Sequence, residues 1–131
     1  MTKSYTDIEQ SKQLAEILPI ESADMAYMAI IEDYMYPQKV KEYRLTIKDE
    51  CFNSKYDIPA WSLAALLENI PVSCDDGQHC FALINCNPKD DTEWLSCYED
   101  CKGNLLNECY SDNPLDACYE MIVKLKEKGL L

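Results

Sequence analysis

The sequence predicts an α+β fold in a single domain spanning residues 1–131, with three helices packed against a mostly antiparallel sheet of about four to five strands. Three observations indicate this class. The chain has 131 residues, the length of one domain, and 47% of them are hydrophobic. Residues 42–48 (EYRLTIK) alternate apolar and polar side chains as a half-buried strand does. Residues 113–129 carry the start and stop signals of a complete helix.

The N-terminal part contains one predicted helix, followed by an undecided segment. Thr6 and Glu9 form a T-x-x-E capping box and Pro19 forbids continuation, so we expect a helix over about residues 7–18. Residues 23–37 mix Met and Ala, which favour helix, with Tyr and Ile, which allow a strand. We expect an extended start there and leave the remainder open.

The most apolar stretch, PAWSLAALLENIP at residues 59–71, predicts a helix that is buried on most sides. Pro59 fits the first helical position, and Pro71 lies beyond the end. Apolar side chains occupy nearly the whole circumference of this helix, whereas a partner-binding helix would show a narrower stripe. We therefore expect Trp61 and Leu66 to be core residues.

Three strands follow a turn at Asp76-Gly77. The strands are expected at residues 79–86, 92–99 and 105–111. Gly103 is available for a positive φ, so the last two strands form a plausible hairpin.

The last predicted helix has both a start signal and a stop signal in the sequence. Asn113 can cap it, Pro114 occupies the first position, and Gly129 ends it. Its lysines lie toward the C-terminal end, where the helix dipole favours positive charge.

The charge is strongly negative and unevenly distributed. The net charge is −12, and residues 68–120 hold twelve acidic residues against two lysines, a net of −10. Such a region repels phosphate, which argues against nucleic acid, and attracts a basic protein surface. The acidic pairs at predicted loop ends are the candidate partner-binding residues, and we expect them to gather in space: Asp75, Asp76, Asp90, Asp91, Glu99 and Asp100.

The eight cysteines predict reduced thiols in a cytoplasmic protein. The N-terminal sequence MTKSYTDIEQSKQ lacks the apolar middle of a secretion signal, and the cytosol keeps thiols free. Five lie in predicted strands or helices, where a free Cys behaves as a small buried hydrophobe. These are Cys80, Cys86, Cys97, Cys109 and Cys118.

The alternative to a protein-interaction module is a zinc module. Its ligands would be Cys74, His79, Cys97 and Cys101. The gap between Cys74 and His79 is unusual for zinc, and Cys97 falls inside a predicted strand, so we expect no metal. With three glycines the chain has no phosphate-binding loop, and we expect no cofactor.

No catalytic motif is found, so the sequence predicts a non-enzymatic protein. His79 is the one histidine, and Cys80 beside it would point to the opposite face of a strand, away from a shared proton. A small enzyme of unknown reaction stays open as a further alternative. No apolar run reaches the roughly 20 residues of a membrane span, so we expect no membrane partner.

Three motifs together resemble a group of small proteins of gut Bacteroidales genomes and their phages or mobile elements. They are IESADM (residues 20–25), PAWSLAALLENIP (59–71) and NPLDACYEMIVKLKEKGLL (113–131). The group has no assigned activity, so the resemblance supplies no site residue. It implies an accessory or host-interaction role rather than a metabolic one.

Overall fold

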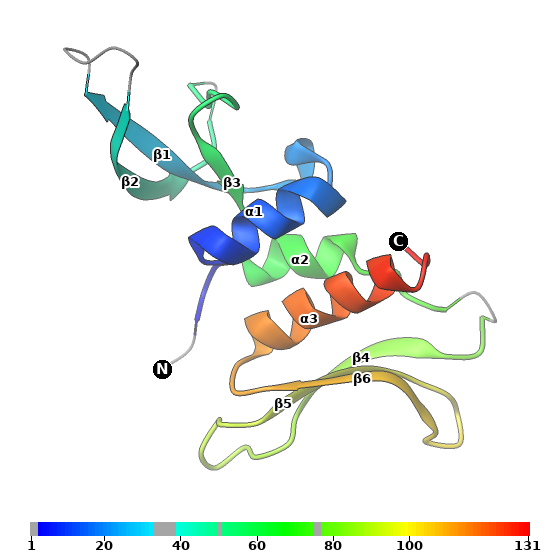
Figure 1. Cartoon of the computed structure of the whole chain (residues 1–131). Helices are drawn as coiled ribbons and strands as arrows, with labels where there is room; N and C mark the ends of the chain where they lie inside the picture. The colour runs from blue at the N-terminus through cyan, green and yellow to red at the C-terminus, as the bar shows by residue number, and fades with distance from the viewer. Residues whose placement is uncertain (1–2, 33–38, 50, 75–76) are drawn as a thin grey trace. The chain divides into compact units, whose positions relative to one another are not determined.

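The computed structural model describes residues 3–32, 39–49, 51–74 and 77–131 (Figure 1). The chain divides into two compact units, one of residues 5–62 and one of residues 1–4 with 63–131. Each unit combines helix with a three-stranded antiparallel sheet, which confirms the α+β class. Because the described residues hold six strands in two sheets, the expected single sheet of four to five strands is wrong. The single domain stays a prediction.

The unit of residues 5–62 is built around a central strand. Its elements are helix α1 (Ile8–Ile17), the 3-10 turn η1 (Ile20–Ser22) and strands β1 (Met25–Glu32), β2 (Lys39–Ile47) and β3 (Ile58–Ala60). β1 pairs antiparallel with both β2 and β3, and α1 contacts β3. The extended start expected within residues 23–37 is confirmed by β1, whereas residues 33–38 lie outside the described part of the chain.

Helix α1 begins with a capping box one residue later than predicted. Asp7, rather than Thr6, accepts from the backbone N–H of Gln10, and the Gln10 side chain accepts from the Asp7 N–H. Thr6 is fully buried instead, and its hydroxyl lies 2.8 Å from the Ser11 hydroxyl and accepts from the Trp61 N–H at 3.1 Å. The Thr6 side chain therefore links α1 to the end of β3.

The apolar stretch of residues 59–71 contributes to two elements rather than to one helix. Pro59 lies in β3, an edge strand, where a residue without an N–H is tolerated. Helix α2 (Leu63–Asn69) starts after Trp61, so the predicted helix start at Pro59 is wrong. Trp61 and Leu66 are both fully buried, which confirms them as core residues. Of the seven residues of α2, Ala65 and Leu66 alone are buried and Leu67 is 39% exposed, so the expected burial of this helix on most sides is wrong.

The second unit packs two helices and a sheet in layers (Figure 1). Strands β4 (Cys80–Asn85), β5 (Trp94–Glu99) and β6 (Leu105–Ser111) form an antiparallel meander with β5 in the centre. Helix α3 (Pro114–Glu127) lies along one face of this sheet, and α2 packs against α3. The three strands, the hairpin and the final helix lie at the residues expected, although β4, whose apolar residues on both faces are typical of a central strand, is at an edge.

The predicted ends of α3 are confirmed in atomic detail. The Asn113 side chain accepts from the Asp116 N–H at 2.8 Å, Pro114 is the first helical residue, and Gly129 adopts a φ of +72° after the helix. Eight of its side chains are buried, which explains how α3 covers the sheet. Within the described ranges, no helix has the length and apolar character needed to cross a membrane.

Replacing Thr6 by Val should destabilise the protein by about 2–3 kcal/mol. The substitution keeps the side-chain volume but leaves the Ser11 hydroxyl and the Trp61 N–H without their buried partner. Urea unfolding measures the loss. The matched control is Thr46→Val on the half-buried surface of β2, where we expect less than about 1 kcal/mol. Equal losses in the two variants would contradict the structural role of Thr6.

Candidate functional site

Helix α3 covers one face of the sheet β4–β5–β6, and the opposite face carries the candidate site. The Ser96 hydroxyl donates to the Ala117 carbonyl oxygen of α3 at 2.7 Å, so Ser96 points toward the helix. Its neighbour Leu95 therefore points to the opposite face. Ile84 and Tyr110 are paired directly with Leu95 on either side and share its face.

We call this surface the outer face. Its members include Ile84, Glu93, Leu95, Cys97, Glu99, Glu108 and Tyr110, together with the uncharged β4 residues paired with them, Cys80, Ala82 and Cys86. Glu93 belongs to it because the Glu93 carbonyl accepts from the Cys86 N–H at 2.8 Å, which extends the pairing and alternation of β5 by one residue. Three carboxylates therefore lie on the β5 and β6 side of a small apolar centre.

The pKa of Tyr110 is raised by the negative charges of the outer face. Its side chain is 55% exposed, and its hydroxyl donates to Glu108 Oε2 at 3.3 Å. The negative charge of Glu108 is the main cause that raises the pKa of Tyr110, and Cys86 and Glu93 add to it. An exposed tyrosine amid carboxylates is suited to contact a cationic partner.

Cys97 lies on the outer face near the carboxylates of Glu99 and Glu108. It is fully buried although it points away from α3, so side chains of the outer face cover it. Burial raises the pKa of the Cys97 thiol, and the nearby carboxylates of Glu99 and Glu108 raise it further. The thiol is therefore neutral and poorly nucleophilic at pH 7.

The structure separates the predicted acidic pairs instead of gathering them. Asp90 and Asp91 lie in the loop before β5, whereas Glu99 and Asp100 lie at its far end. A six-residue strand at about 3.4 Å per residue holds the two pairs roughly 17 Å apart, because successive turns of a meander fall at opposite ends of the sheet. The expected single cluster is wrong for these four residues. Asp75 and Asp76 lie outside the described residues.

Two of these acidic residues stabilise their own turns. Asp91 has a φ of +55°, and its Oδ1 accepts from Asn85 Nδ2 at 3.0 Å and from Trp94 Nε1 at 2.9 Å. Asp100 accepts from the backbone and side chain of Asn104, and these hydrogen bonds are the main cause that lowers the Asp100 pKa. The Asp91 and Asp100 carboxylates therefore stabilise the turns they occupy, and Asp90 makes a longer contact in its loop, accepting from Asn87 Nδ2 at 3.3 Å.

The candidate metal ligands fall in different environments. The Cys74 N–H donates to the His79 carbonyl at 3.0 Å, and His79 Nε2 lies 3.9 Å from Asp100 Oδ2. Cys97 is buried under the outer face, and Cys101 is exposed in the β5–β6 turn. In the part of the chain that the structure describes, no three His, Cys, Asp or Glu side chains are grouped to hold a metal ion.

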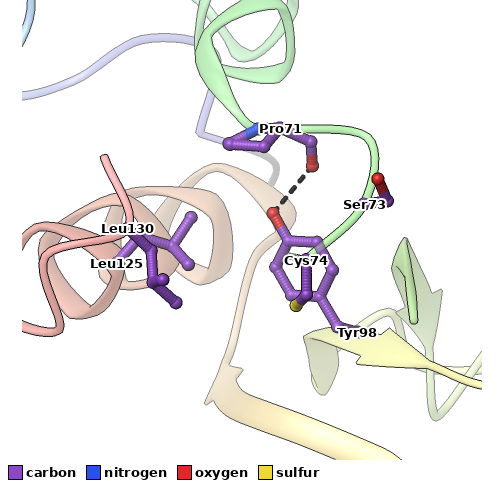
Figure 2. A pocket seen from close by; sticks show the side chains of 6 residues that line it. All are labelled: Pro71, Ser73, Cys74, Tyr98, Leu125 and Leu130. Carbon is purple, nitrogen blue, oxygen red and sulfur yellow. Dashed lines mark hydrogen bonds between the residues drawn. The ribbon is translucent and has the colours of Figure 1, made fainter. Parts of the chain in front are cut away.

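A small pocket lies between α3 and the start of the sheet (Figure 2). It is lined by Pro71, Ser73, Cys74, Tyr98, Leu125 and Leu130 and has a volume of about 20 Å³. The Tyr98 hydroxyl donates across it to the Pro71 carbonyl at 2.7 Å. This space suits about one water molecule, far below the several hundred Å³ of a substrate site, so the pocket belongs to the packing of the unit.

The described residues include all eight cysteines, and their exposure differs from the expectation in part. Cys97, Cys109 and Cys118 are buried as expected for cysteines within strands and helices. Cys80 and Cys86 are exposed, so their predicted burial is wrong, because they lie at the two ends of an edge strand.

No protein-family model, no curated protein and no solved structure matches the chain. The resemblance of the three sequence motifs to Bacteroidales proteins therefore stays a prediction. What the site can do follows from its own residues.

Sequence reasoning missed Glu93, Glu108 and Tyr110 as members of the site. The signal for Glu93 was present, because Glu93, Leu95, Cys97 and Glu99 alternate along one face of a strand. Glu108 could not be placed beside β5 from the sequence. A bulge in β6, opposite the β5 residues between Ser96 and Tyr98, shifts the pairing of the two strands there.

The thiols should react in two groups with a disulfide reagent at pH 8. Cys51, Cys80, Cys86 and Cys101 are exposed and should react first. Cys97, Cys109 and Cys118 should react only after unfolding, because burial raises their pKa, that of Cys118 to about 12. Counting thiols with and without denaturant tests this. Rapid reaction of all eight in the folded protein would contradict the structure.

Tyr98→Phe should lower the free energy of unfolding by about 1–2 kcal/mol at pH 7, because the Pro71 carbonyl loses its hydroxyl donor. Burial raises the pKa of Tyr98 from 10.0 to about 12, so the neutral phenol stabilises the fold below pH 10. Above pH 10 the unfolded chain ionises first, and this stabilisation is lost as the pH rises toward 12. The gap between wild type and variant should therefore narrow in urea titrations across that range, and a constant gap would refute the assignment.

Proposed function

We propose that the protein is a non-enzymatic, cytoplasmic interaction module that presents the outer face to a basic protein surface. The observation that carries this proposal is the composition of that face. Glu93, Glu99 and Glu108 lie beside the exposed side chains of Ile84 and Tyr110 on the side of the sheet that α3 leaves uncovered.

Long-range and short-range forces support the same partner. The net charge of −10 over residues 68–120 would steer a cationic protein toward this unit and repel nucleic acid. At contact, the exposed side chains of Tyr110 and Ile84 would supply apolar area, with carboxylates at the rim. Exposed apolar and aromatic area next to charged side chains is typical of a protein interface.

The role fits an accessory protein. The three motifs that resemble Bacteroidales mobile-element proteins imply host interaction rather than metabolism. A charged recognition surface on the uncovered side of the sheet is consistent with that role.

Reversing the three outer-face carboxylates should abolish electrostatic capture of a cation. We expect Glu93→Lys/Glu99→Lys/Glu108→Lys to bind a fluorescent oligolysine peptide at least about tenfold more weakly than wild type at low salt, since each exposed ion pair contributes up to about 1 kcal/mol. Fluorescence anisotropy measures the affinity. Wild-type binding should also weaken as salt is raised.

A matched variant separates the outer face from the net charge. Glu9→Lys/Glu16→Lys/Glu21→Lys makes the same change in charge at exposed positions of the other unit. It should retain most of the affinity for oligolysine. If the two triple variants lose affinity equally, the overall charge attracts the peptide and the outer face is not a binding surface.

A further inference from the structure

The two edge strands of the sheet β4–β5–β6 differ in how well they are protected from pairing with a further strand. β6 carries a bulge opposite Cys97, with Asn107 at a φ of +55°. Lys124 Nζ donates to the Glu108 carbonyl at 2.9 Å, and Lys128 binds the Asn107 side chain. Bulges and lysines are the devices that prevent another strand from pairing with an edge, so β6 is closed.

The first half of β4 is covered by its own chain. The Cys74 N–H donates to the His79 carbonyl at 3.0 Å, and the Phe81 N–H donates to the Val72 carbonyl at 2.8 Å. This cover ends at Val72, because Ile70 is the residue that would pair with Leu83 in this register, and its N–H donates instead to the Leu67 carbonyl at the end of α2.

The second half of β4 presents unused backbone groups. The Phe81 N–H points away from β5, and the Cys86 N–H points toward β5, where it bonds Glu93. Alternation between them directs the N–H and C=O groups of Leu83 and Asn85 away from β5. Among the described residues of this unit, no loop or turn donates a backbone hydrogen bond to this edge beyond Phe81.

Residues 80–85 (CFALIN) also lack the usual protection of an edge strand. They contain neither a charged residue nor proline, and their pairing with β5 continues without a bulge. Ile84 is 37% exposed, and Val72, where the cover ends, is 81% exposed. An uncharged, regular and open edge is the geometry that accepts an additional strand.

We propose that the β4 edge at Leu83 and Asn85 binds an extended segment of a basic partner protein as a fourth strand of this sheet. The proposal rests on the proposed function for the charge of the partner and adds where and how that partner binds. Backbone hydrogen bonds to Leu83 and Asn85 would give affinity, and the side chains that the segment presents on the outer face would contact Ile84.

Charge selects a basic segment over a second copy of the chain. The loop that follows β4 holds Asp90, Asp91 and Glu93 against the single Lys89. A lysine- or arginine-bearing strand would meet opposite charge there. A second copy would bring another unit with a net charge of −10 over residues 68–120 and be repelled.

Two synthetic peptides test the mode of binding on the intact protein. The first alternates Lys and Val over about six residues, the length of a typical strand. The second has the same sequence and charge, with its interior amide nitrogens methylated so that it cannot donate hydrogen bonds. We expect the methylated peptide to bind at least about tenfold more weakly, because it loses two or more backbone hydrogen bonds. Binding of the first peptide should also slow hydrogen exchange at the Leu83 and Asn85 amides in NMR spectra.

The other possible results distinguish failure of strand addition from failure of the proposed function. Equal affinity for the two peptides would overturn strand addition and leave the acidic recognition surface intact. No binding of either peptide at low salt would overturn both proposals. Slower exchange at Leu83 when the protein alone is concentrated would show that a second copy occupies the edge, which overturns the basic segment as its occupant.

Discussion

The hydrogen bond from Ser96 to the Ala117 carbonyl joins the central strand of the second sheet to the helix that covers it. Both groups are buried, so the contact cannot be exchanged for one with water at low cost. It determines which side chains of β5 lie under α3. Since side chains alternate along a strand, it also determines which ones form the outer face. The position of the carboxylates is thus a consequence of packing on the other side of the sheet.

In the binding mode proposed above, the outer face and the β4 edge would act over different distances. Carboxylates attract an approaching cation over about 10 Å at ordinary salt but do little to orient it. Backbone groups act only at contact, yet they fix the register and direction of a bound strand. A surface that combines the two can capture a partner quickly and still hold it in one arrangement. Since the charges are exposed, salt should affect capture more than it affects the backbone contacts.

The sequence predicted the elements with strong local signals and missed those decided by tertiary contacts. Helix α3 and its cap follow from Asn113, Pro114 and the lysines near its end, and all of these are confirmed. The start of α1 was misplaced because Thr6 satisfies the capping pattern, but its hydroxyl is needed in the core. Pro59 fits both the first turn of a helix and an edge strand, and pairing with β1 decides between them.

The sequence predicted the negative charge of the candidate site but not the positions of its acidic residues. The acidic excess is a property of composition, and it indicated a basic partner without any structure. The expectation that acidic loops would gather failed because consecutive turns of a meander lie at opposite ends of its strands. Glu108 and Glu99 both lie near Cys97 because a bulge in β6 shifts the pairing with β5. The sequence around these residues does not reveal that bulge.

The unit of residues 5–62 closes on itself. Tyr5 and Ser62 form an antiparallel bridge, and the Thr6 N–H donates to the Trp61 carbonyl at 2.9 Å. Its two ends are therefore neighbours, at about the 5 Å spacing of paired strands. Ser4 and Leu63, which belong to the other unit, leave the bridge from adjacent points. The first unit thus has the connectivity of a cassette inserted into the second, and such a cassette can be gained, lost or exchanged during evolution while the chain that flanks it is rejoined across a single short gap.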